Sequence, residues 1–298
     1  MIKKIISHSY LNNLALVILL FSILVVAITW VLYTRVPITS DPLNPSGFTI
    51  GFDWQVTFRP SVLMMFAGKN PYDIPIYRIL NPPWVLLALA PLALLPLQMG
   101  TAVLFVLGLF IFGYAAIRFK ASPWIVAAFV LSPQVIGNSV HGNVDWMVAL
   151  GATLPPQIGL FFVLTKPQMG ACIALFWLVE IWRSKGLRQV VRVFAPVTIA
   201  LLLSFALYGF WPLKIVSMVQ VNSTNVSLFP QSLPIGIALL ARALSWRKQS
   251  PAVMASPFLS PYMQWNSWSI ALFGLVNSPY LFWATWATLW VLRLVWRI

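Results

Sequence analysis

The feature that most constrains this chain is an uncharged apolar run of twenty residues, LALVILLFSILVVAITWVLY, from Leu14 to Tyr33. A helix of that length crosses the hydrocarbon core of a bilayer, where the backbone must satisfy its own hydrogen bonds. Because 60% of all residues are hydrophobic and only 8% are charged, the sequence indicates an integral membrane protein with an all-α fold. The apolar core of a signal peptide is shorter, so we expect this run to remain as a span.

Further apolar runs follow along the whole chain, and no polar block between them is long enough to fold separately. We therefore predict one transmembrane domain over residues 1–298, a polytopic helical bundle of about 8–10 membrane helices that include short and half helices. Two outer-face loops, 35–82 and 212–231, are expected, the first carrying interfacial helices. The expected helices cover residues 14–34, 82–96, 99–117, 123–140, 143–165 (broken at Pro155-Pro156), 167–183, 190–211, 232–246, 251–275 and 278–296.

A net charge of +14 fits either nucleic-acid binding or the positive-inside rule of membrane proteins. Most basic residues lie in short clusters between apolar runs, which favours the second interpretation and argues against nucleic acid as a partner. We therefore predict a multi-pass protein of the inner (plasma) membrane with both termini cytoplasmic. The clusters are Lys3/Lys4, Arg118/Lys120, Arg183/Lys185/Arg188/Arg192, Arg242/Arg247/Lys248 and Arg293/Arg297.

The chain has five acidic residues, and four of them, Asp41, Asp53, Asp73 and Asp145, fall at or near the predicted outer face. Asp53 lies among aromatic residues before a segment with amphipathic helical spacing, 54–67. A carboxylate beside apolar groups tends to have a raised pKa, which suits a general base; the alternative is an N-cap for that helix. Asp73, in GKNPYD, is expected to cap or hold a turn, and Glu180 to pair with Arg183 one helical turn away.

The stretch HGNVDW brings His141, Asn143 and Asp145 to one helix entrance. Histidine and aspartate at this spacing are typical of part of a metal site, but two ligands do not complete one. Asp145 has two other interpretations, an N-cap or a partner for a nearby cation. The single cysteine, Cys172, excludes an intrachain disulfide and is expected to be a small core residue.

Lysine at the start of a helix is a natural anion site, and Lys166 in LTKPQMG precedes a proline that opens a helix. It shares the predicted outer face with Arg59, Lys69 and Arg78, so we expect an anionic group to be held there. In the second outer loop, Asn225 and its neutral polar neighbours suit sugar hydroxyls or a glycosylation signal. The segment SPFLSPYMQWNSW, 256–268, is irregular and is expected to line a cavity or lie buried in protein.

In this order, the motifs resemble the GT-C class of integral membrane glycosyltransferases, most closely the polyprenol-phosphate-mannose-dependent mannosyltransferase-like family. The pieces are an early acid at Asp53, then GKNPYD, NPPWVLLALAPLALLP, HGNVD followed by TKPQ, and finally NVSL and SPYMQW. They span about residues 48–268. The chain departs from the family in having Gly142-Asn143 where Gly-Gln is frequent, and in its clipped, proline-interrupted spans.

The resemblance implies that Asp53 is the general base of an inverting transfer of a hexose, such as mannose, from a polyprenyl-phosphate donor. The reaction would take place at the periplasmic or extracellular face, with membrane lipid and an unidentified acceptor as partners, and with no cofactor and no metal. The substrate-binding residues that it implies are Arg59, Lys69, Tyr72, Asn81, His141, Asn143, Asp145, Lys166, Gln168, Asn225, Tyr262 and Gln264.

Two other functions fit the same sequence. A non-catalytic relative of the GT-C fold would serve as an accessory subunit of a membrane complex, and its many aromatic residues would pack against lipid and partners. A transporter or flippase for a lipid-linked sugar would need buried ionisable residues along its path. Glu180 is the one clear candidate within a span, and it has an ordinary partner in Arg183, so the transferase is the favoured hypothesis.

Overall fold

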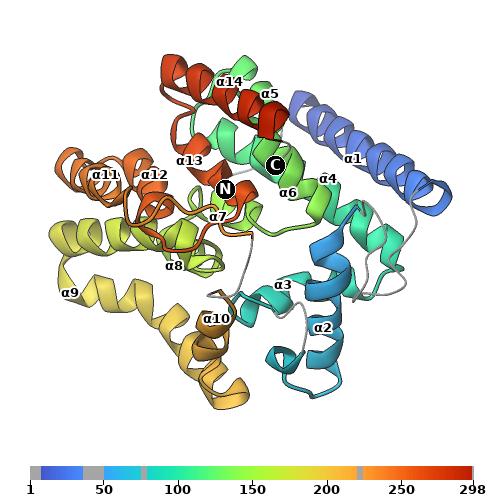
Figure 1. The fold of residues 1–298 in the computed structure, drawn as a ribbon, viewed down its shortest axis with the longest axis horizontal. Helices are drawn as coiled ribbons and strands as arrows, with labels where there is room; N and C mark the ends of the chain where they lie inside the picture. Colours follow the sequence, from blue (N-terminus) through green and yellow to red (C-terminus); the bar gives the residue numbers. More distant parts are fainter. Residues whose placement is uncertain (1–7, 36–49, 75–78, 220–223, 297–298) are drawn as a thin grey trace.

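The structure, a computed structural model, describes residues 8–35, 50–74, 79–219 and 224–296. These residues form helices and connecting loops, without a strand in the described part of the chain (Figure 1). The α-helices are α1 (His8–Thr34), α2 (Arg59–Phe66), α3 (Trp84–Ala93), α4 (Leu97–Arg118), α5 (Pro123–Val130), α6 (Pro133–His141), α7 (Trp146–Gly151), α8 (Pro156–Val163), α9 (Pro167–Tyr208), α10 (Trp211–Val219), α11 (Leu233–Trp246), α12 (Gln249–Leu259), α13 (Ser269–Gly274) and α14 (Pro279–Trp296).

Three short turns complete the set: the π-helical η1 (Trp54–Phe58) and the 3₁₀ turns η2 (Pro71–Asp73) and η3 (Trp265–Trp268). The segment expected as a helix over 54–67 is therefore confirmed, although it begins as a π turn before α2. Helical turns of this π type are rare and occur frequently at functional sites. The 3₁₀ turn η2 contains Asp73 of the GKNPYD motif.

Among the described residues, α1, α4 and α9 are long and apolar enough to cross a membrane. The pair α5–α6, bent by 49° at its break, would make a fourth span if it crosses as one unit. α9 has 42 residues, about 63 Å of helix, which is roughly twice the thickness of the hydrocarbon core. Its backbone is not helical at Gly186 (φ 74°, ψ 177°), and Figure 1 shows two arms that meet at an angle.

Proline and glycine explain most of the breaks in the bundle. α7 ends before Pro155-Pro156 and α8 begins at Pro156, as the sequence predicts, because a proline cannot donate the backbone hydrogen bond that a helix interior needs. Gly186 adopts the left-handed region and separates the predicted spans 167–183 and 190–211. The helix expected over 251–275 is interrupted within the stretch that the sequence marks as irregular, 256–268, because the chain leaves helical geometry after Leu259 and returns to it only at η3.

The helices pack around one main core of buried aromatic and aliphatic side chains. Helix α4 lies against α1, α5, α6 and α7, whereas α12 lies against α9, α11 and α13. Figure 1 shows α1 at one edge of the molecule, and α11 and α12 at the opposite edge. Most of α1 is exposed. Only 11% of its most apolar stretch is buried in the protein, which suits a helix surrounded by lipid.

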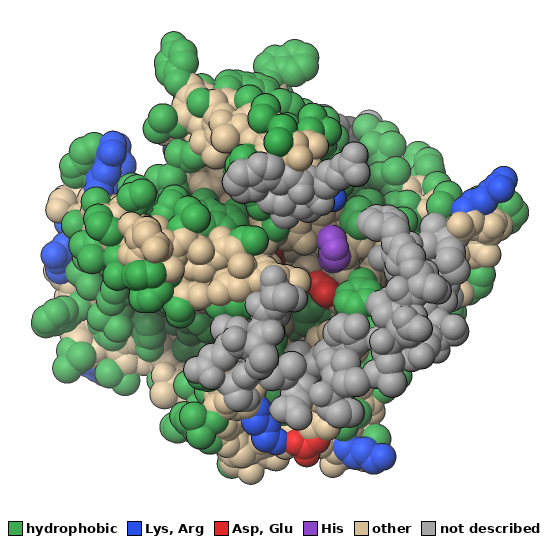
Figure 2. Space-filling model, viewed as in Figure 1, with side chains coloured by type: hydrophobic (Ala, Val, Ile, Leu, Met, Phe, Trp, Pro, Cys, Tyr) green, Lys and Arg blue, Asp and Glu red, His purple; other side chains and the backbone are tan. Residues whose placement is uncertain are grey.

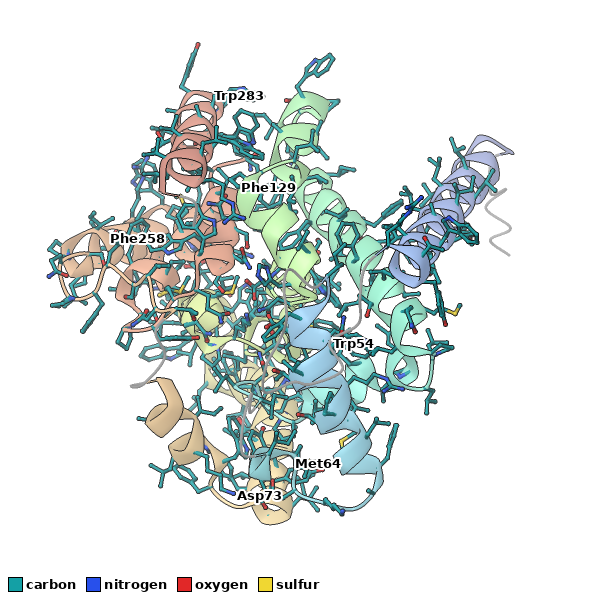
Figure 3. All side chains as sticks on the ribbon, turned by 45° about the vertical axis from the view of Figure 1, so that its right-hand side comes forward. Trp54, Met64, Asp73, Phe129, Phe258 and Trp283 are labelled. Atoms are coloured by element: carbon teal, nitrogen blue, oxygen red, sulfur yellow. The ribbon has the colours of Figure 1, made fainter. Side chains whose placement is uncertain are left out.

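At the other end of the molecule, η2 packs against α10. The rings of Tyr72 and Trp211 are stacked with centroids 5.4 Å apart, and the amide of Asn70 donates to the carbonyl of Tyr208. In Figure 3, Asp73 and Met64 lie at the lower end of the molecule, far from Trp54. Asp53 and Asp73, which share one predicted outer loop, therefore belong to different parts of the fold.

Candidate functional site

Asp53 is positioned by a close approach between the chain before η1 and the end of α6. The backbone N–H of Gly51 donates to the carbonyl of Val140 at 2.6 Å. Gly142, which ends α6, has a φ of 67°, and a Cβ there would lie 3.0 Å from the Cβ of Trp54 and 3.1 Å from the Cα of Gly51. Glycine therefore fits this position for two reasons, its left-handed backbone and the lack of room for a side chain.

The carboxylate of Asp53 accepts a hydrogen bond from Nδ2 of Asn143 at 2.7 Å, across ninety positions of sequence. The alternative of a helix N-cap for Asp53 is wrong, because this side chain makes no capping hydrogen bond and its own backbone is already helical (φ −61°, ψ −34°). Its side chain is thus directed to the HGNVD segment instead of to its own helix. This long-range contact is the central feature of the candidate site.

The pKa of Asp53 is raised above its ordinary value of 3.8, mainly because burial disfavours the charged carboxylate. His141, Lys166 and the Asn143 hydrogen bond act in the opposite direction, and the charge of Asp145 adds slightly to the increase. Asp53 nevertheless keeps part of its surface accessible. In Figure 2, a histidine and an acidic side chain lie next to each other in a hollow of the displayed face.

Asn143 connects Asp53 to a buried ion pair. Its Oδ1 accepts a hydrogen bond of 2.7 Å from Nζ of Lys166 and another of 2.7 Å from the backbone N–H of Val144. Both donors bind the amide oxygen, so they fix the amide orientation and present the NH₂ group to Asp53. The order Lys166–Asn143–Asp53 is therefore set by donor and acceptor chemistry.

Lys166 also contacts Oδ1 of Asp145, with 6% and 0% of the two side chains exposed. Oδ2 of Asp145 accepts a hydrogen bond from the hydroxyl of Ser267 at 2.9 Å. Of the alternatives for Asp145, the N-cap is wrong, because no capping hydrogen bond is made, and pairing with a cation is confirmed. Lys166 is thereby committed to two protein oxygens, so it is not a free cation at a helix N-terminus.

The irregular segment after α12 also contributes residues to the site. Oε1 of Gln264 lies 3.5 Å from Nδ2 of Asn143, and Gln264 also shares a hydrogen bond with the buried Tyr262, as does Thr224. Burial raises the pKa of the Tyr262 hydroxyl above its ordinary value of 10.0. The prediction that segment 256–268 lies against the protein interior is therefore confirmed for these residues.

His141 lies at the end of α6, and its charge favours the ionised form of the Asp53 carboxylate. Its Nδ1 is 2.7 Å from the carbonyl of Gly137. Because a carbonyl only accepts, Nδ1 carries the hydrogen of this contact. The amide of Asn266 lies 3.3 Å from the same nitrogen, and η3 thus packs against this end of α6.

The predicted residues Tyr72 and Asn81 hold the chain just before Lys166 through hydrogen bonds. The buried Tyr72 hydroxyl donates to the carbonyl of Asn81 at 2.8 Å, and the Asn81 amide donates to the carbonyl of Thr165 at 2.9 Å. Thr165 precedes Lys166, so this relay fixes the backbone that presents the ammonium. These two residues do not contact Asp53 through any hydrogen bond in the described part of the chain.

The other predicted residues lie apart from this network. Asn225 binds the backbone of Pro261 and Met263 and so joins the chain before α11 to the 260–263 segment. Lys69 is exposed, and Gln168 is half-buried near the start of α9. Arg59 is half-buried at the start of α2, and its Nε has no hydrogen-bond partner among the described residues.

Outside the site, two acids pair with basic residues at the surface. Asp73 forms an ion pair with Lys214 at 2.5 Å, whereas Asn70 caps the η2 turn. The predicted pair of Glu180 with Arg183 is confirmed at 3.8 Å, and Arg247 adds a closer contact of 2.7 Å. Arg78, an expected outer cation, lies outside the described residues.

Ser267 could not be predicted from the sequence, because a serine among aromatic residues carries no motif of its own. The buried polar face of α6 could not be predicted either. Within the described ranges, no three histidine, cysteine or acidic side chains gather as a metal site. The buried Cys172 is a core residue, as expected, and its backbone N–H donates to the hydroxyl of Ser256.

The site thus contains one partly accessible carboxylate, an amide whose orientation is fixed, and a buried ion pair. It lies where several apolar helices end: α6 ends at His141, α9 begins after Lys166, and a Cβ on Gly51 would come within 2.4 Å of Thr101 in the first turns of α4. This arrangement can hold a hydroxyl group and take its proton. No protein-family model, no curated protein and no solved structure matches this chain.

Proposed function

We propose that this chain is a GT-C-type membrane glycosyltransferase that moves a hexose, such as mannose, from a polyprenyl-phosphate donor to an acceptor hydroxyl at the outer face of the membrane. The observation that carries the proposal is the Asp53 carboxylate. It is partly accessible, its pKa is raised, and Asn143 holds it at 2.7 Å. A raised pKa brings a carboxylate closer to the working pH, where it is a more effective general base.

In the proposed reaction, the acceptor hydroxyl donates its proton to Asp53 while its oxygen attacks the anomeric carbon of the sugar. The bond from that carbon to the phosphate oxygen breaks, and polyprenyl phosphate leaves with the electron pair. Attack opposite to the leaving group inverts the anomeric configuration. Asp53 then returns its proton to solvent, so atoms and charge balance.

The leaving phosphate gains negative charge, which preorganised positive groups stabilise. Lys166 is committed to Asn143 and Asp145, so we assign it to the orientation of the site. We assign Arg59 to the phosphate, because it is half-buried and its Nε lacks a partner among the described residues.

A lipid-linked donor needs a site next to a bilayer. The site borders the ends of helices that are long and apolar enough to span one. We place it on the outer side of the plasma membrane, with both termini in the cytoplasm, because the basic cluster around Gly186 would then face inward. The finer topology of a polytopic bundle is part of the same proposal.

The test compares Asp53→Asn with Asp73→Asn in protein purified in detergent or nanodiscs, with radiolabelled polyprenyl-phosphate mannose and membrane acceptors. We expect Asp53→Asn to lose about 10²–10⁴-fold in transfer rate. Asp73→Asn, which alters only the exposed acid of the same loop, should retain it. Transfer that survives in Asp53→Asn would contradict the assigned base. Purified wild-type protein that binds no lipid-linked sugar would favour the accessory-subunit hypothesis.

A further inference from the structure

The buried face of α6 carries two amide side chains that the candidate site does not use. Gln134 and Asn138 are both fully buried, with 0% exposure. Neither the nitrogen nor the oxygen of either amide has a hydrogen-bond partner among the described residues. They lie four positions apart, so both project from the same side of the helix.

This side of α6 faces η3. Gly137 lies on it, and a Cβ there would come within 2.4 Å of Oδ1 of Asn266. His141, one turn further on, contacts the same Asn266 amide. The spacing of residues 134, 137, 138 and 141 defines a single helical face. The two unpaired amides therefore point to the seam between α6 and the chain that contains η3.

The chain at and after η3 also carries buried polar side chains. Ser267 and Ser269 are fully buried. The hydroxyl of Ser267 donates to Asp145, but the hydroxyl of Ser269, directly after η3, has no partner in the described part of the chain. Buried polar groups in folded proteins are nearly always hydrogen-bonded. The four unpaired amide atoms on this face of α6 thus indicate a small polar ligand, and the unpaired Ser269 hydroxyl next to η3 is consistent with it.

The chemistry of the two amides selects the ligand. Each has a donor group and an acceptor atom, so a cation would satisfy only the oxygens and an anion only the NH₂ groups. A ligand that both donates and accepts is required, and it must be small because the side chains have no exposed surface. We propose that ordered water molecules occupy the α6–η3 seam as a structural site, bound by Gln134 and Asn138. This inference is independent of the proposed function.

The water site would join two elements that carry the candidate site. α6 ends in His141 and leads directly to Asn143, and η3 follows Gln264 and contains Ser267. Waters between them would therefore fix the distance between the Asn143 side and the Gln264 side of the network. Because both amides also lie on one helix, loss of either one would weaken the same seam.

The first measurement is a high-resolution experimental structure of the wild-type protein in nanodiscs. We expect density peaks about 2.7–3.2 Å from amide atoms of both Gln134 and Asn138. Absence of such density would overturn the proposal. A peak that contacts oxygens only, and that disappears when choline replaces sodium and potassium, would identify a cation and would also overturn it.

The second measurement is the thermal midpoint of the full-length Asn138→Leu variant, with Asn81→Leu as the matched control. The Asn81 amide is buried and donates to a protein carbonyl, so its removal should lower the midpoint. If water binds Asn138, its removal should also lower the midpoint, by about 2–4 °C. In a dry seam the same change would remove an unpaired buried amide and raise the midpoint, which would contradict the proposal.

Discussion

The buried Lys166–Asp145 pair gives the sharpest prediction about stability. Only 6% and 0% of the two side chains are exposed, so the pair is shielded from solvent. Removal of one partner from a buried pair leaves the other charge unpaired and costs about 3–5 kcal/mol. For a chain of this size, that corresponds to a decrease of roughly 6–20 °C in the thermal midpoint. We therefore expect Lys166→Met and Asp145→Leu to be strongly destabilised when measured separately.

The double variant separates the worth of the pair from the cost of an unpaired charge. Replacement of a buried ion pair by apolar side chains of similar volume is often neutral or stabilising. We expect Lys166→Met/Asp145→Leu to recover most of the midpoint that either single change loses. It should still show reduced transfer, because the Asn143 oxygen loses its donor from Lys166.

A second lysine–aspartate pair in the same chain is the control. Lys214 and Asp73 have side chains that are 41% and 57% exposed, and surface pairs of this kind contribute about 0–1 kcal/mol. Lys214→Met should therefore change the midpoint by at most a few degrees. The assay is differential scanning fluorimetry in one detergent for all variants. Equal small losses for Lys166→Met and Lys214→Met would refute the argument that burial makes the inner pair different.

Three further predictions follow from single contacts. Asn143→Leu removes a hydrogen bond that lowers the pKa of Asp53, so the acid limb of the activity–pH profile should move to higher pH. Gly142→Ala places a side chain at a φ of 67°, where a Cβ meets Trp54 at 3.0 Å; a loss of more than about 1 kcal/mol in unfolding free energy is expected. Tyr72→Phe removes a buried hydrogen bond and should cost about 0.5–1.5 kcal/mol in chemical denaturation. An unchanged pH profile, or unchanged stability, would contradict the corresponding contact.

The helical elements could be predicted from the sequence because apolar length, proline and glycine act locally. The breaks at Pro155-Pro156 and near Gly186 are direct consequences of backbone chemistry. For the helix expected over 251–275, the two Ser-Pro steps predicted irregular backbone, but not the residue at which the helix ends. Its composition is apolar enough for a span, and periodicity alone does not show that the chain leaves helical geometry after Leu259.

The site could be predicted only as a set of separate motifs. Local rules favoured an N-cap for Asp53 and left Asp145 open between an N-cap and a cation partner, since aspartate is a frequent capping residue. The structure instead joins Asp53 to Asn143 across ninety positions and Asp145 to Lys166. Such contacts depend on which helix ends meet, and a single sequence does not specify that meeting. The unpaired amides of Gln134 and Asn138 were missed because a polar residue in a short helix carries no signal of its burial.

The raised pKa of Asp53 provides a test of its proposed catalytic role against a structural one. Its pKa is raised in the fold, so its ionisation opposes folding, and the stability lost in this way grows as pH increases from 3.8 toward the folded value. A carboxylate kept for stability would show the opposite shift, because paired or hydrogen-bonded acids usually have lowered pKa values. Burial therefore disfavours the ionised form of Asp53 in the fold, despite the donor that Asn143 supplies. Asp53→Asn should raise the thermal midpoint near neutral pH while it removes transfer, and a variant that lost both would show that Asp53 serves the fold instead.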